Sequence, residues 1–425
     1  MSANSDVHER ISTLTPTTTT DAPAVPVLSD EHAALAAADS VAAVVAAGSL
    51  RRELDGELPT EALQTVAASG LLGILVPAEH GGPDLPQSVA VEVIRRLARA
   101  DSAVGQLLLS HYVLSAGIRG LGRTEPAPTI YGDILAGAQL GNASAERGTR
   151  TAAERKTTVR RLDDGRWELH GTKYYATGSL GASWIGVGAR VEGTDHGATV
   201  FVRPTDSGVT LDLQNWSAFG QRGTASGTVI LDHVIVDDRL VIDEGPDPDP
   251  VTAAPSVLGA FDQALHTAID VGIARAALED GAEFVRTKSR PWFEANVDRA
   301  ADEPHVIRRF GELTARLWAL EALLEKGSRL IDAARAEPEL TRDSAAAASL
   351  TIASAKALAQ EFAIEIASGV LELAGTSSTD GKYGLDRHWR NVRVHSLHDP
   401  ARWKYVHIGN HTLHGTRPPR LGVLL

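Results

Sequence analysis

Apolar residues recur at helical spacing through the first part of the chain. The stretch SDEHAALAAADSVAAVVAAG offers Ser29 or Asp30 as an amino-terminal cap and ends at Gly48. After the turn-forming PAEHGGPD, the segments SVAVEVIRRLARAD and DSAVGQLLLSHYVLSAGIRGLG continue the same spacing. This pattern predicts an amino-terminal helical domain over residues 29–138, with a buried helix around SHYVLS.

The period changes after Gly137 to that of short strands. RWELHGTKYYATG, ASWIGVGARVEG, ATVFVRP and GTVILDHVIVDD are rich in Val, Ile, Tyr and Trp and are punctuated by Gly and Asp. The connector DEGPDPDPVTAAP then leads to long helical segments at 256–288, 304–336 and 343–374. We therefore predict an α+β chain, with a central β domain over residues 139–250 and a carboxy-terminal four-helix bundle within residues 251–425.

The amino terminus and the overall charge narrow the class of protein. The tract TLTPTTTTDAPAVP has low complexity, so residues 1–28 are predicted to form a disordered tail. A net charge of −13 over 425 residues provides no basic field for a nucleic acid. We expect no stretch that is apolar over the length of a membrane span, and no secretion signal. These observations predict a cytoplasmic protein with neither a nucleic acid nor a membrane as partner.

Sulfur is almost absent from the sequence. There is no cysteine, and the single methionine is the initiator. This composition excludes disulfides, thiolate catalysis and cysteine-ligated metals. Two interpretations stay open: drift in an alanine-rich sequence, or selection for a protein that is made in quantity when sulfur is scarce.

Five motifs follow one another along the chain. They are GTKYYATGSLGASW, FGQRGTASGTVILDHVIV, TKSRPWF, LELAGTSS and LDRHWRNVRV. In this order they resemble the motifs of the acyl-CoA dehydrogenase superfamily, and the resemblance covers nearly the whole chain beyond residue 30. It implies that superfamily's fold, which agrees with the predicted order of helices, β domain and helical bundle, and it implies a flavin site.

The resemblance distributes the flavin contacts over several of these motifs. It places Thr177 near flavin N5, and Trp216 is expected against the ring. Arg290 and Arg387 are candidates for the phosphate, because a guanidinium group binds phosphate through two hydrogen bonds. The remaining cofactor candidates, including backbone N–H groups for the same phosphate, are Asn142, Ser179, Trp292, Gly375, Thr376, Ser377 and His398.

The sequence departs from the superfamily where most acyl-CoA dehydrogenases carry the glutamate that removes the substrate α-proton. Here that place reads His398-Asp399-Pro400, and the proline biases Asp399 toward an extended backbone. The surrounding RHWRNVRVHSLHDPARWK and HTLHG resemble a narrower branch, the flavin-dependent monooxygenases of the dibenzothiophene monooxygenase type. The departure therefore favours oxygen transfer over dehydrogenation.

That branch implies reduced FMN, with FAD as an alternative, supplied by a separate NAD(P)H:flavin reductase. Oxygen adds to the reduced flavin to give a C4a-hydroperoxyflavin, which transfers one oxygen atom to a small organic substrate. The sulfur-poor sequence and the branch together favour an organosulfur substrate and a role in sulfur scavenging. The resemblance also implies a homotetramer built through the helical bundle, with the flavin near a subunit interface.

Histidines and hydroxyls are the expected catalytic groups. An imidazole donates and accepts protons near neutral pH, so His398 is the candidate for contact with the flavin–oxygen adduct, with His395 beside it and Ser179 also assigned to catalysis. Asp399 would fix a histidine tautomer or cap the backbone. The substrate-side candidates are His111, Tyr112 and Trp216. A buried core histidine bonded to local groups is an equal alternative for the first of these.

Other functions remain open from the sequence. They are an acyl-CoA dehydrogenase that uses Asp399, an N-hydroxylating flavin monooxygenase, and a scaffold protein without a site. A metal protein is a further alternative, because His395, His398 and Asp399, or His407 and His411, have spacings that metal ligands use. No H-E-x-x-H motif accompanies them, so we predict no metal.

Overall fold

The computed structural model describes residues 24–120, 126–246 and 253–419. Most of the predicted disordered tail lies outside these ranges. The described helices of the amino-terminal region are α2 (Glu31–Asp55), α3 (Thr60–Ala68), α4 (Gln87–Ala100), α5 (Ser102–Gly120) and α6 (Ala127–Leu135). Asp30 caps α2 by accepting a hydrogen bond from Ala33 N at 2.9 Å, and Gly56 ends the helix with a φ of 70°. The predicted helical region is confirmed.

Helix α2 is more apolar than the sequence analysis expects. It is 25 residues long, and an 18-residue window within it has a mean hydropathy of 1.7, which matches a membrane span in length and composition. The expectation that no stretch reaches this composition is therefore wrong, because Ala, Val and Leu together fill most positions of the helix. A single helix of this kind near the amino terminus is a weak indication of a membrane, and its buried residues Ala34, Ala38, Val41 and Val45 belong to the core, where α2 packs against α4.

The central domain is built on one sheet, as predicted. Its strands are β1 (Gln139–Ala143), β2 (Thr158–Arg161), β3 (Trp167–Lys173), β4 (Ala182–Val191), β5 (His196–Val202), β6 (Val209–Asp212), β7 (Thr228–Val236) and β8 (Val241–Pro246). The hydrogen-bonded order is β6-β7-β3-β2-β4-β5-β8, and β1 pairs in parallel with β4. Val159, Leu169, Val187, Val200 and Val234 belong to the apolar core of this sheet, distinct from the helical core.

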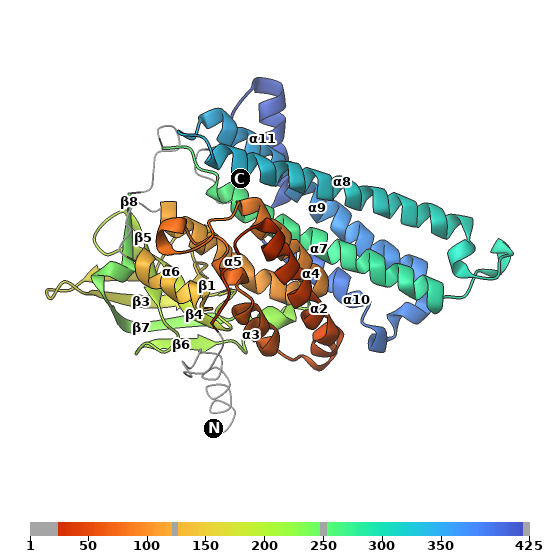
Figure 1. The fold of residues 1–425 in the computed structure, drawn as a ribbon, viewed down its shortest axis with the longest axis horizontal. Helices are drawn as coiled ribbons and strands as arrows, with labels where there is room; N and C mark the ends of the chain where they lie inside the picture. Colours follow the sequence, from red (N-terminus) through yellow and green to blue (C-terminus); the bar gives the residue numbers. More distant parts are fainter. Residues whose placement is uncertain (1–23, 121–125, 247–252, 420–425) are drawn as a thin grey trace.

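The carboxy-terminal part is helical. Its helices are α7 (Leu258–Thr287), α8 (Pro304–Arg335), α9 (Arg342–Ala374), α10 (Asp386–His395) and α11 (Ala401–His414). The three long helices lie side by side, and α4 of the amino-terminal region packs against α7 (Figure 1). Helix α10 contacts both α7 and α9, while α11 contacts α9. The predicted α+β order of helical region, β domain and helical domain is confirmed.

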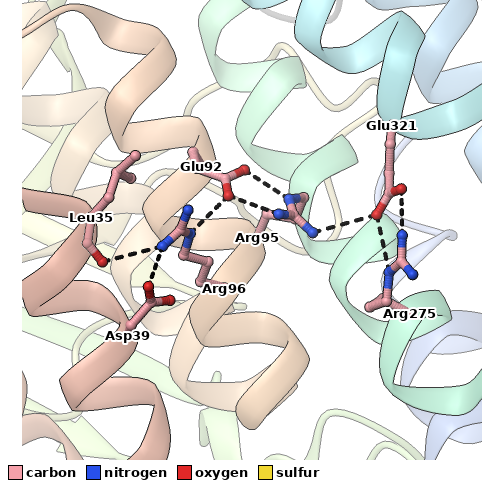
Figure 2. Close-up of polar contacts among 7 residues, drawn as sticks. All are labelled: Leu35, Asp39, Glu92, Arg95, Arg96, Arg275 and Glu321. Atoms are coloured by element: carbon pink, nitrogen blue, oxygen red, sulfur yellow. Dashed lines mark hydrogen bonds and ion pairs between the residues drawn. The ribbon is translucent and has the colours of Figure 1, made fainter. Parts of the chain in front are cut away.

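Charged side chains tie the two helical regions together. Figure 2 shows Leu35, Asp39, Glu92, Arg95, Arg96, Arg275 and Glu321. Arg96 of α4 binds Asp39 of α2 at 2.6 Å. Glu321 of α8 accepts from Arg95 of α4 at 3.4 Å and also binds Arg275 of α7. Each partly exposed pair contributes at most about 1 kcal/mol, but together they set the relative positions of α2, α4, α7 and α8.

Gly272 sets the closest approach between α7 and α4. A Cβ atom at this position would lie 2.6 Å from the carbonyl oxygen of Arg95 and 2.9 Å from the Cβ atom of Ala98, both in α4. Backbone atoms cannot turn aside as the end of a flexible side chain can. A side chain here would therefore push the two helices apart.

We predict that Gly272→Ala lowers the free energy of unfolding by about 1–3 kcal/mol, because it overpacks this crossing. Gly311 of α8 is the matched control, since a Cβ atom there meets open space. Gly311→Ala should stabilise the protein by up to about 1 kcal/mol through its higher helix propensity. Denaturant unfolding of both variants measures the two effects, and a gain in stability from Gly272→Ala would contradict the prediction.

Candidate active site

A cleft with a volume of about 1140 Å³ lies between the amino-terminal helices, the loop after β6 and α10. Trp216 and Leu213 form part of its apolar wall, and Gln221 and Asn391 contribute polar groups. We refer to it as the Trp216 cleft. Among the predicted cofactor residues, Trp216 and Arg387 line this cleft. The cleft therefore brings the β domain and α10 together around one aromatic ring.

A chain of hydrogen bonds connects Thr177, the predicted flavin contact, to α10. Its hydroxyl oxygen lies 2.8 Å from Ser226 Oγ, which donates to Thr224 Oγ1 at 2.9 Å. The Thr224 hydroxyl donates to the carbonyl oxygen of Gln221 at 2.8 Å. Gln221 N in turn donates to Asn391 Oδ1 of α10 at 2.6 Å. The loop before β4, the loop before β7 and α10 are thus fixed relative to one another.

The backbone beside Trp216 is strained. Three residues other than glycine have left-handed φ values there: Tyr175 at 55°, Gln221 at 52° and Ala225 at 42°. Such conformations cost on the order of 1–3 kcal/mol each and gather at functional sites. The Tyr175 ring meets the Trp216 ring edge-on with 6.2 Å between centroids, and Trp216 Nε1 donates to the Gln221 carbonyl at 2.9 Å. The strain thus surrounds the indole that was predicted to face the flavin.

Buried polar atoms without partners also mark this region. Within the described part of the chain, neither side-chain atom of Gln221 has a hydrogen-bond partner, although the residue is buried. Ser179 Oγ, in the loop between β3 and β4, is likewise buried and unpaired. Such groups cost about 1–3 kcal/mol each unless a ligand or water bonds to them. A flavin presents donors and acceptors along its pyrimidine edge and a flat apolar ring, so an amide beside an indole fits it.

A second group of polar side chains lies at the far end of α10, between α7, α9 and α11. We refer to it as the imidazole cluster, and its members are Asp262, His266, Asp270, Lys356, His395, His398, Asp399 and Lys404. The rings of His266 and His398 stack with 3.8 Å between centroids. His266 Nδ1 also lies 3.1 Å from His395 Nε2. The structure therefore joins the predicted pair, His395 and His398, through a third imidazole.

The ion pair of Lys356 and Asp270 sets the protonation of this cluster. Lys356 Nζ lies 2.7 Å from Asp270 Oδ2, and both side chains are fully buried. Burial alone would raise the pKa of Asp270, but the charge of Lys356 and the hydrogen bond from His395 outweigh it, and the pKa is lowered. The Asp270 carboxylate therefore accepts a hydrogen bond from Nδ1–H of His395 at 2.6 Å. Burial lowers the pKa of His395, so its Nε2 carries a lone pair that accepts Nδ1–H of His266.

His398 is the accessible member of the cluster, with its side chain 42% exposed. It lies in the turn between α10 and α11, directly before Asp399 and Pro400. Asp399 is buried, its Oδ2 binds Lys404 Nζ at 2.6 Å, and its Oδ1 is 3.5 Å from His398 Nδ1. Burial would raise the pKa of Asp399, but His398 and the charges of Lys356 and Lys404 hold it far below its usual value. Such a carboxylate is a weak base, which disfavours the acyl-CoA dehydrogenase alternative.

Other predicted cofactor residues lie outside the wall of the Trp216 cleft. Ser289 Oγ donates to the Ala374 carbonyl at 3.0 Å, which brings the segments after α7 and α9 together. The exposed candidates in these two segments are Arg290, Trp292, Gly375, Thr376 and Ser377. Asn142 of β1 donates its backbone N–H to the Thr177 carbonyl at 3.0 Å, so it lies beside the predicted flavin threonine. Their contacts to a cofactor remain predictions.

The two predicted substrate residues of α5 are fully buried. His111 Nδ1 accepts from Leu140 N at 3.1 Å, so its Nε2–H donates to the Leu72 carbonyl at 2.8 Å. Burial lowers the pKa of His111 to about 4. Tyr112 OH donates to the Leu71 carbonyl at 3.0 Å. This geometry matches the core-histidine alternative, and substrate contact by either side chain remains a prediction.

The hydrogen bonds of His395 leave neither of its ring nitrogens free to bind a metal ion. Its Nδ1 is bonded to Asp270 and its Nε2 to His266, so neither ring nitrogen has a free lone pair. A histidine ligand must offer such a lone pair to the ion. The geometry therefore favours a proton-handling cluster over a metal centre built on His395 and His398.

Sequence reasoning missed several residues of the site. Gln221 and Asn391 stand inside two of the motifs, FGQRGTASG and RNVRV, but no role was assigned to them. Asp262, His266 and Asp270 follow one another at intervals of four residues. That spacing puts polar groups on one face of an otherwise apolar helix and was a readable signal of a buried polar site.

Three family models match successive parts of the chain. They are the acyl-CoA dehydrogenase N-terminal domain over residues 29–135, its middle domain over 142–234 and its C-terminal domain over 264–403. The chain belongs to the acyl-CoA dehydrogenase family. The resemblance carried by the five motifs is thereby confirmed.

Within this family, the relatives with the higher sequence identities are monooxygenases, and two acyl-CoA dehydrogenases match at 24% and 25% identity. Dibenzothiophene monooxygenase of Rhodococcus qingshengii is 32% identical over 88% of this chain and 91% of that protein. The probable FMNH2-dependent monooxygenase SfnC of Pseudomonas putida is 29% identical over 92% of this chain and 98% of that protein. The structure of FMN-bound TdsC from Paenibacillus sp. A11-2 is similar with a TM-score of 0.86 and 28% identity, covering 92% of this chain and 100% of that one. The predicted branch and enzyme class are confirmed.

We predict that Lys356→Met lowers the free energy of unfolding by about 3–5 kcal/mol, because it leaves Asp270 buried and unpaired. The loss should shrink as the pH falls, since the unpaired Asp270 then has a raised pKa and binds a proton in the folded state. Adding Asp270→Asn should recover part of the stability by removing the uncompensated charge.

Lys382→Met is the control for this experiment, since Lys382 and Asp380 form an exposed pair. It should cost no more than about 1 kcal/mol. Denaturant unfolding across a pH series measures all variants. Simple addition of the Lys356→Met and Asp270→Asn losses would contradict the coupling.

Proposed function

We propose that the protein is an FMNH2-dependent monooxygenase that transfers one oxygen atom of O2 to a small organosulfur substrate. The observation that carries the proposal is the His398-Asp399-Pro400 turn. There a partly exposed imidazole rests on a buried imidazole cluster, and the adjacent carboxylate is bound to Lys404. A dehydrogenase needs a free carboxylate base at this place, whereas oxygen transfer needs a group that gives and takes a proton near neutral pH.

The residues around the Trp216 cleft are suited to hold the flavin. When bound, reduced FMN supplies both electrons and activates O2. The unpaired amide of Gln221 and the hydroxyl of Thr177 would bond to the polar edge of the ring, while Trp216 covers its apolar face. Strained backbone at Tyr175 and Gln221 and the bond from Gln221 N to Asn391 keep these groups in place without the ligand.

His398 would hold and deliver the proton that oxygen transfer requires. Asp399 Oδ1 lies 3.5 Å from Nδ1 of His398, where it can orient the ring. Lys404 keeps Asp399 ionised, so the carboxylate attracts the N–H group of His398 and does not compete for its proton. The buried side of the ring rests on His266, which shields it from water. The exposed side of His398 is then the one that meets the reacting groups.

The substrate class rests on two supports. One relative is named for dibenzothiophene, an aromatic thiophene. The sequence itself contains no cysteine and only its initiator methionine, which suits a protein made when sulfur is scarce. Sulfur in thioethers and thiophenes is a soft nucleophile that accepts an electrophilic oxygen without prior activation. FMN is favoured over FAD because the TdsC structure contains FMN and SfnC is named as FMNH2-dependent.

Assembly and supply of the flavin complete the proposal. The chain would act in the cytoplasm as a homotetramer, with a separate NAD(P)H:flavin reductase providing FMNH2. Large exposed aromatic side chains support contact between copies: Trp292, Phe293, Trp318 and Trp403 are each more than half exposed. Arg290 and the segment around Gly375 are exposed as well, so a second copy could bring them to a cofactor phosphate.

The test of this function is a substrate panel with isotopically labelled O2. The enzyme is mixed with photoreduced FMN and offered thioethers, sulfoxides, sulfones and thiophenes beside amines and phenols. We expect one labelled oxygen atom in a sulfur product. Turnover confined to the amines or phenols would reject the organosulfur substrate, and reduction of bound FMN by an acyl-CoA would reject the monooxygenase.

We predict that His398→Phe keeps the ring stacked on His266 but removes the proton carrier. Reduced FMN should bind with nearly unchanged affinity, while product formation falls by about 10²-fold or more and hydrogen peroxide appears instead. Product and peroxide are measured in the same reaction. His305→Phe, at an exposed histidine of α8, is the matched control and should leave both unchanged. Normal product yield from His398→Phe would exclude the proposed role of His398.

A further inference from the structure

One carboxyl group of the imidazole cluster lacks a lysine partner. The other two buried aspartates of the cluster are each bound to a lysine, at 2.7 and 2.6 Å. Asp262 of α7 is also buried, yet among the ion pairs of the described residues its partner is His266, with Nε2 3.9 Å from Asp262 Oδ1. Asp262 Oδ2 accepts from Gln263 Nε2 at 3.1 Å. The carboxyl group thus faces an imidazole, while the charges of Lys356 and Lys404 reach it without forming an ion pair with it among the described residues.

The hydrogen-bond directions leave a proton acceptor opposite Asp262. His266 donates its Nδ1–H to His395, and burial keeps the pKa of His266 far below its usual value, so its Nε2 carries a lone pair. A lone pair and an ionised carboxylate would repel each other, whereas a protonated carboxyl group can donate to the lone pair. At 3.9 Å this contact needs a small rotation or one bridging water. The arrangement therefore favours a proton on Asp262.

The same imidazole connects Asp262 to the accessible end of the cluster. The His266 ring lies against the His398 ring, with centroids 3.8 Å apart and planes inclined by 28°. His398 is close enough for its charge to act on Asp262. The same ring thus meets the buried carboxyl group at its edge and the group that we assign to oxygen transfer at its face.

We propose that Asp262 is a proton store for the reaction at His398, and that His266 is the positioning residue that connects the two. The ring of His266 is held by His395, and through it by the buried pair of Asp270 and Lys356. This proposal rests on the monooxygenase function proposed above. It assigns a task to a buried carboxyl group that the fold does not need for an ion pair.

The overall reaction shows why a store is required. Reduced FMN, O2 and the substrate give oxidised FMN, the oxygenated substrate and water. The two electrons and both hydrogens of the reduced flavin end in the water, so no proton is gained or lost overall. The flavin would release its hydrogens at one place and time, and the departing oxygen would be protonated at another. Stacked rings pass no proton through their faces, so a bridging water would carry the proton from Asp262 to His398 when that oxygen leaves, and Asp262 would regain a proton when the flavin is again oxidised.

The charges around Asp262 support this assignment. Burial, helped by the charge of Asp399, raises the pKa of Asp262 to about 6 against the opposing effects of His398, the hydrogen bond from Gln263 and Lys356. The titratable groups that face it from α7, α9, α10, the following turn and α11 are His266, Lys356, His395, His398, Asp399 and Lys404. A carboxyl group with a pKa near neutrality can both release and recover a proton during turnover.

Infrared difference spectroscopy of the full chain without flavin tests where the proton resides. Spectra are compared between about pH 4.5 and about pH 8. The wild type should lose the C=O band of a buried, protonated carboxyl group with a midpoint at pH about 6. Asp262→Asn, which keeps the shape and the bond from Gln263, should lack this band. Absence of the band in the wild type would show an ionised Asp262 and overturn the proposal.

Thermal unfolding gives a second measurement with a defined sign. Because the folded-state pKa of Asp262 is raised, its contribution to stability is present below its ordinary pKa of 3.8 and is lost as the pH rises through about 6. Asp262→Asn should therefore gain stability relative to the wild type as the pH rises from about 4.5 to about 7.5.

Asp280→Asn, on the same helix, is the matched control. Burial would raise the pKa of Asp280, but His388 and Arg387 outweigh it and lower the pKa. This variant should be less stable than the wild type at neutral pH, and the difference should shrink on acidification. If the stabilities of both variants relative to the wild type changed in the same direction with pH, the assignment of Asp262 would be overturned.

The reaction itself separates the proton store from the proposed function. In the wild type, the fraction of flavin oxidation that yields product should fall as the pH rises through the pKa of Asp262. In Asp262→Asn this fraction should be flat and, at the acid end, about tenfold lower than in the wild type. A wild-type pH profile in Asp262→Asn would refute the store. If the wild type oxygenates no compound of the panel, the proposed function fails, and the infrared and stability results alone decide whether Asp262 holds the proton.

Discussion

The buried ion pair between Lys356 and Asp270 is the interaction on which the imidazole cluster depends. It joins α9 to α7, and neither side chain reaches solvent. Charges in such a place lose their hydration, a cost of several kcal/mol per ion that mutual attraction offsets only in part. The pair therefore contributes little net stability, but it fixes the direction of the hydrogen bonds that begin at Asp270. An ionised Asp270 can only accept, so His395 must donate to it, and each following imidazole then has one allowed tautomer.

Helix α10 makes the Trp216 cleft and the imidazole cluster a single site. Asn391 holds the loop that carries Gln221, and His395, the last residue of the helix, enters the cluster. Both ends of α10 are bonded to carboxylates of α7: Asp280 binds His388 at 2.8 Å, and Asp270 binds His395 at 2.6 Å. A shift of α10 along α7 would therefore disturb the cofactor side and the proton side together. Helix α10 ends at His395 and Pro400 precedes the first residue of α11, which leaves His398 in the turn between the two helices.

Most of the fold could be predicted from local sequence, whereas the inner part of the site could not. The three long helices of the carboxy-terminal part begin and end within a few residues of the predicted limits, because apolar spacing and glycine or proline punctuation are local signals. Helix α2 instead continues past its predicted end at Gly48 to Asp55. Partners such as Lys356 and Asp270 are 86 residues apart in sequence, and only the packing of α7 on α9 brings them together. Arg290 and Trp292 were assigned from a motif, and in one chain both are exposed, so no contact within that chain could define their role. The apolar length of α2 was not predicted, because alanine, its most frequent residue, is small and gives a weaker apolar signal than leucine or isoleucine.

The scarcity of methionine and the burial of the Lys356–Asp270 pair have a common structural basis, which is the close packing of α7 against α9. Methionine usually fills irregular gaps between helices, and here it is absent after the initiator. Helices α7 and α9 instead approach closely: a Cβ atom at Gly281 would lie 2.6 Å from the Cβ atom of Val370. The small buried residues that flank Lys356 along α9 are Ala353, Ala355, Ala357 and Ala359. The ion pair between these helices is fully buried, and the Asp270 carboxylate is bonded to the lysine and to the imidazole of His395. Either drift or sulfur scarcity could have removed the methionines. In both cases the close packing of small residues in their place keeps the chain of imidazoles ordered.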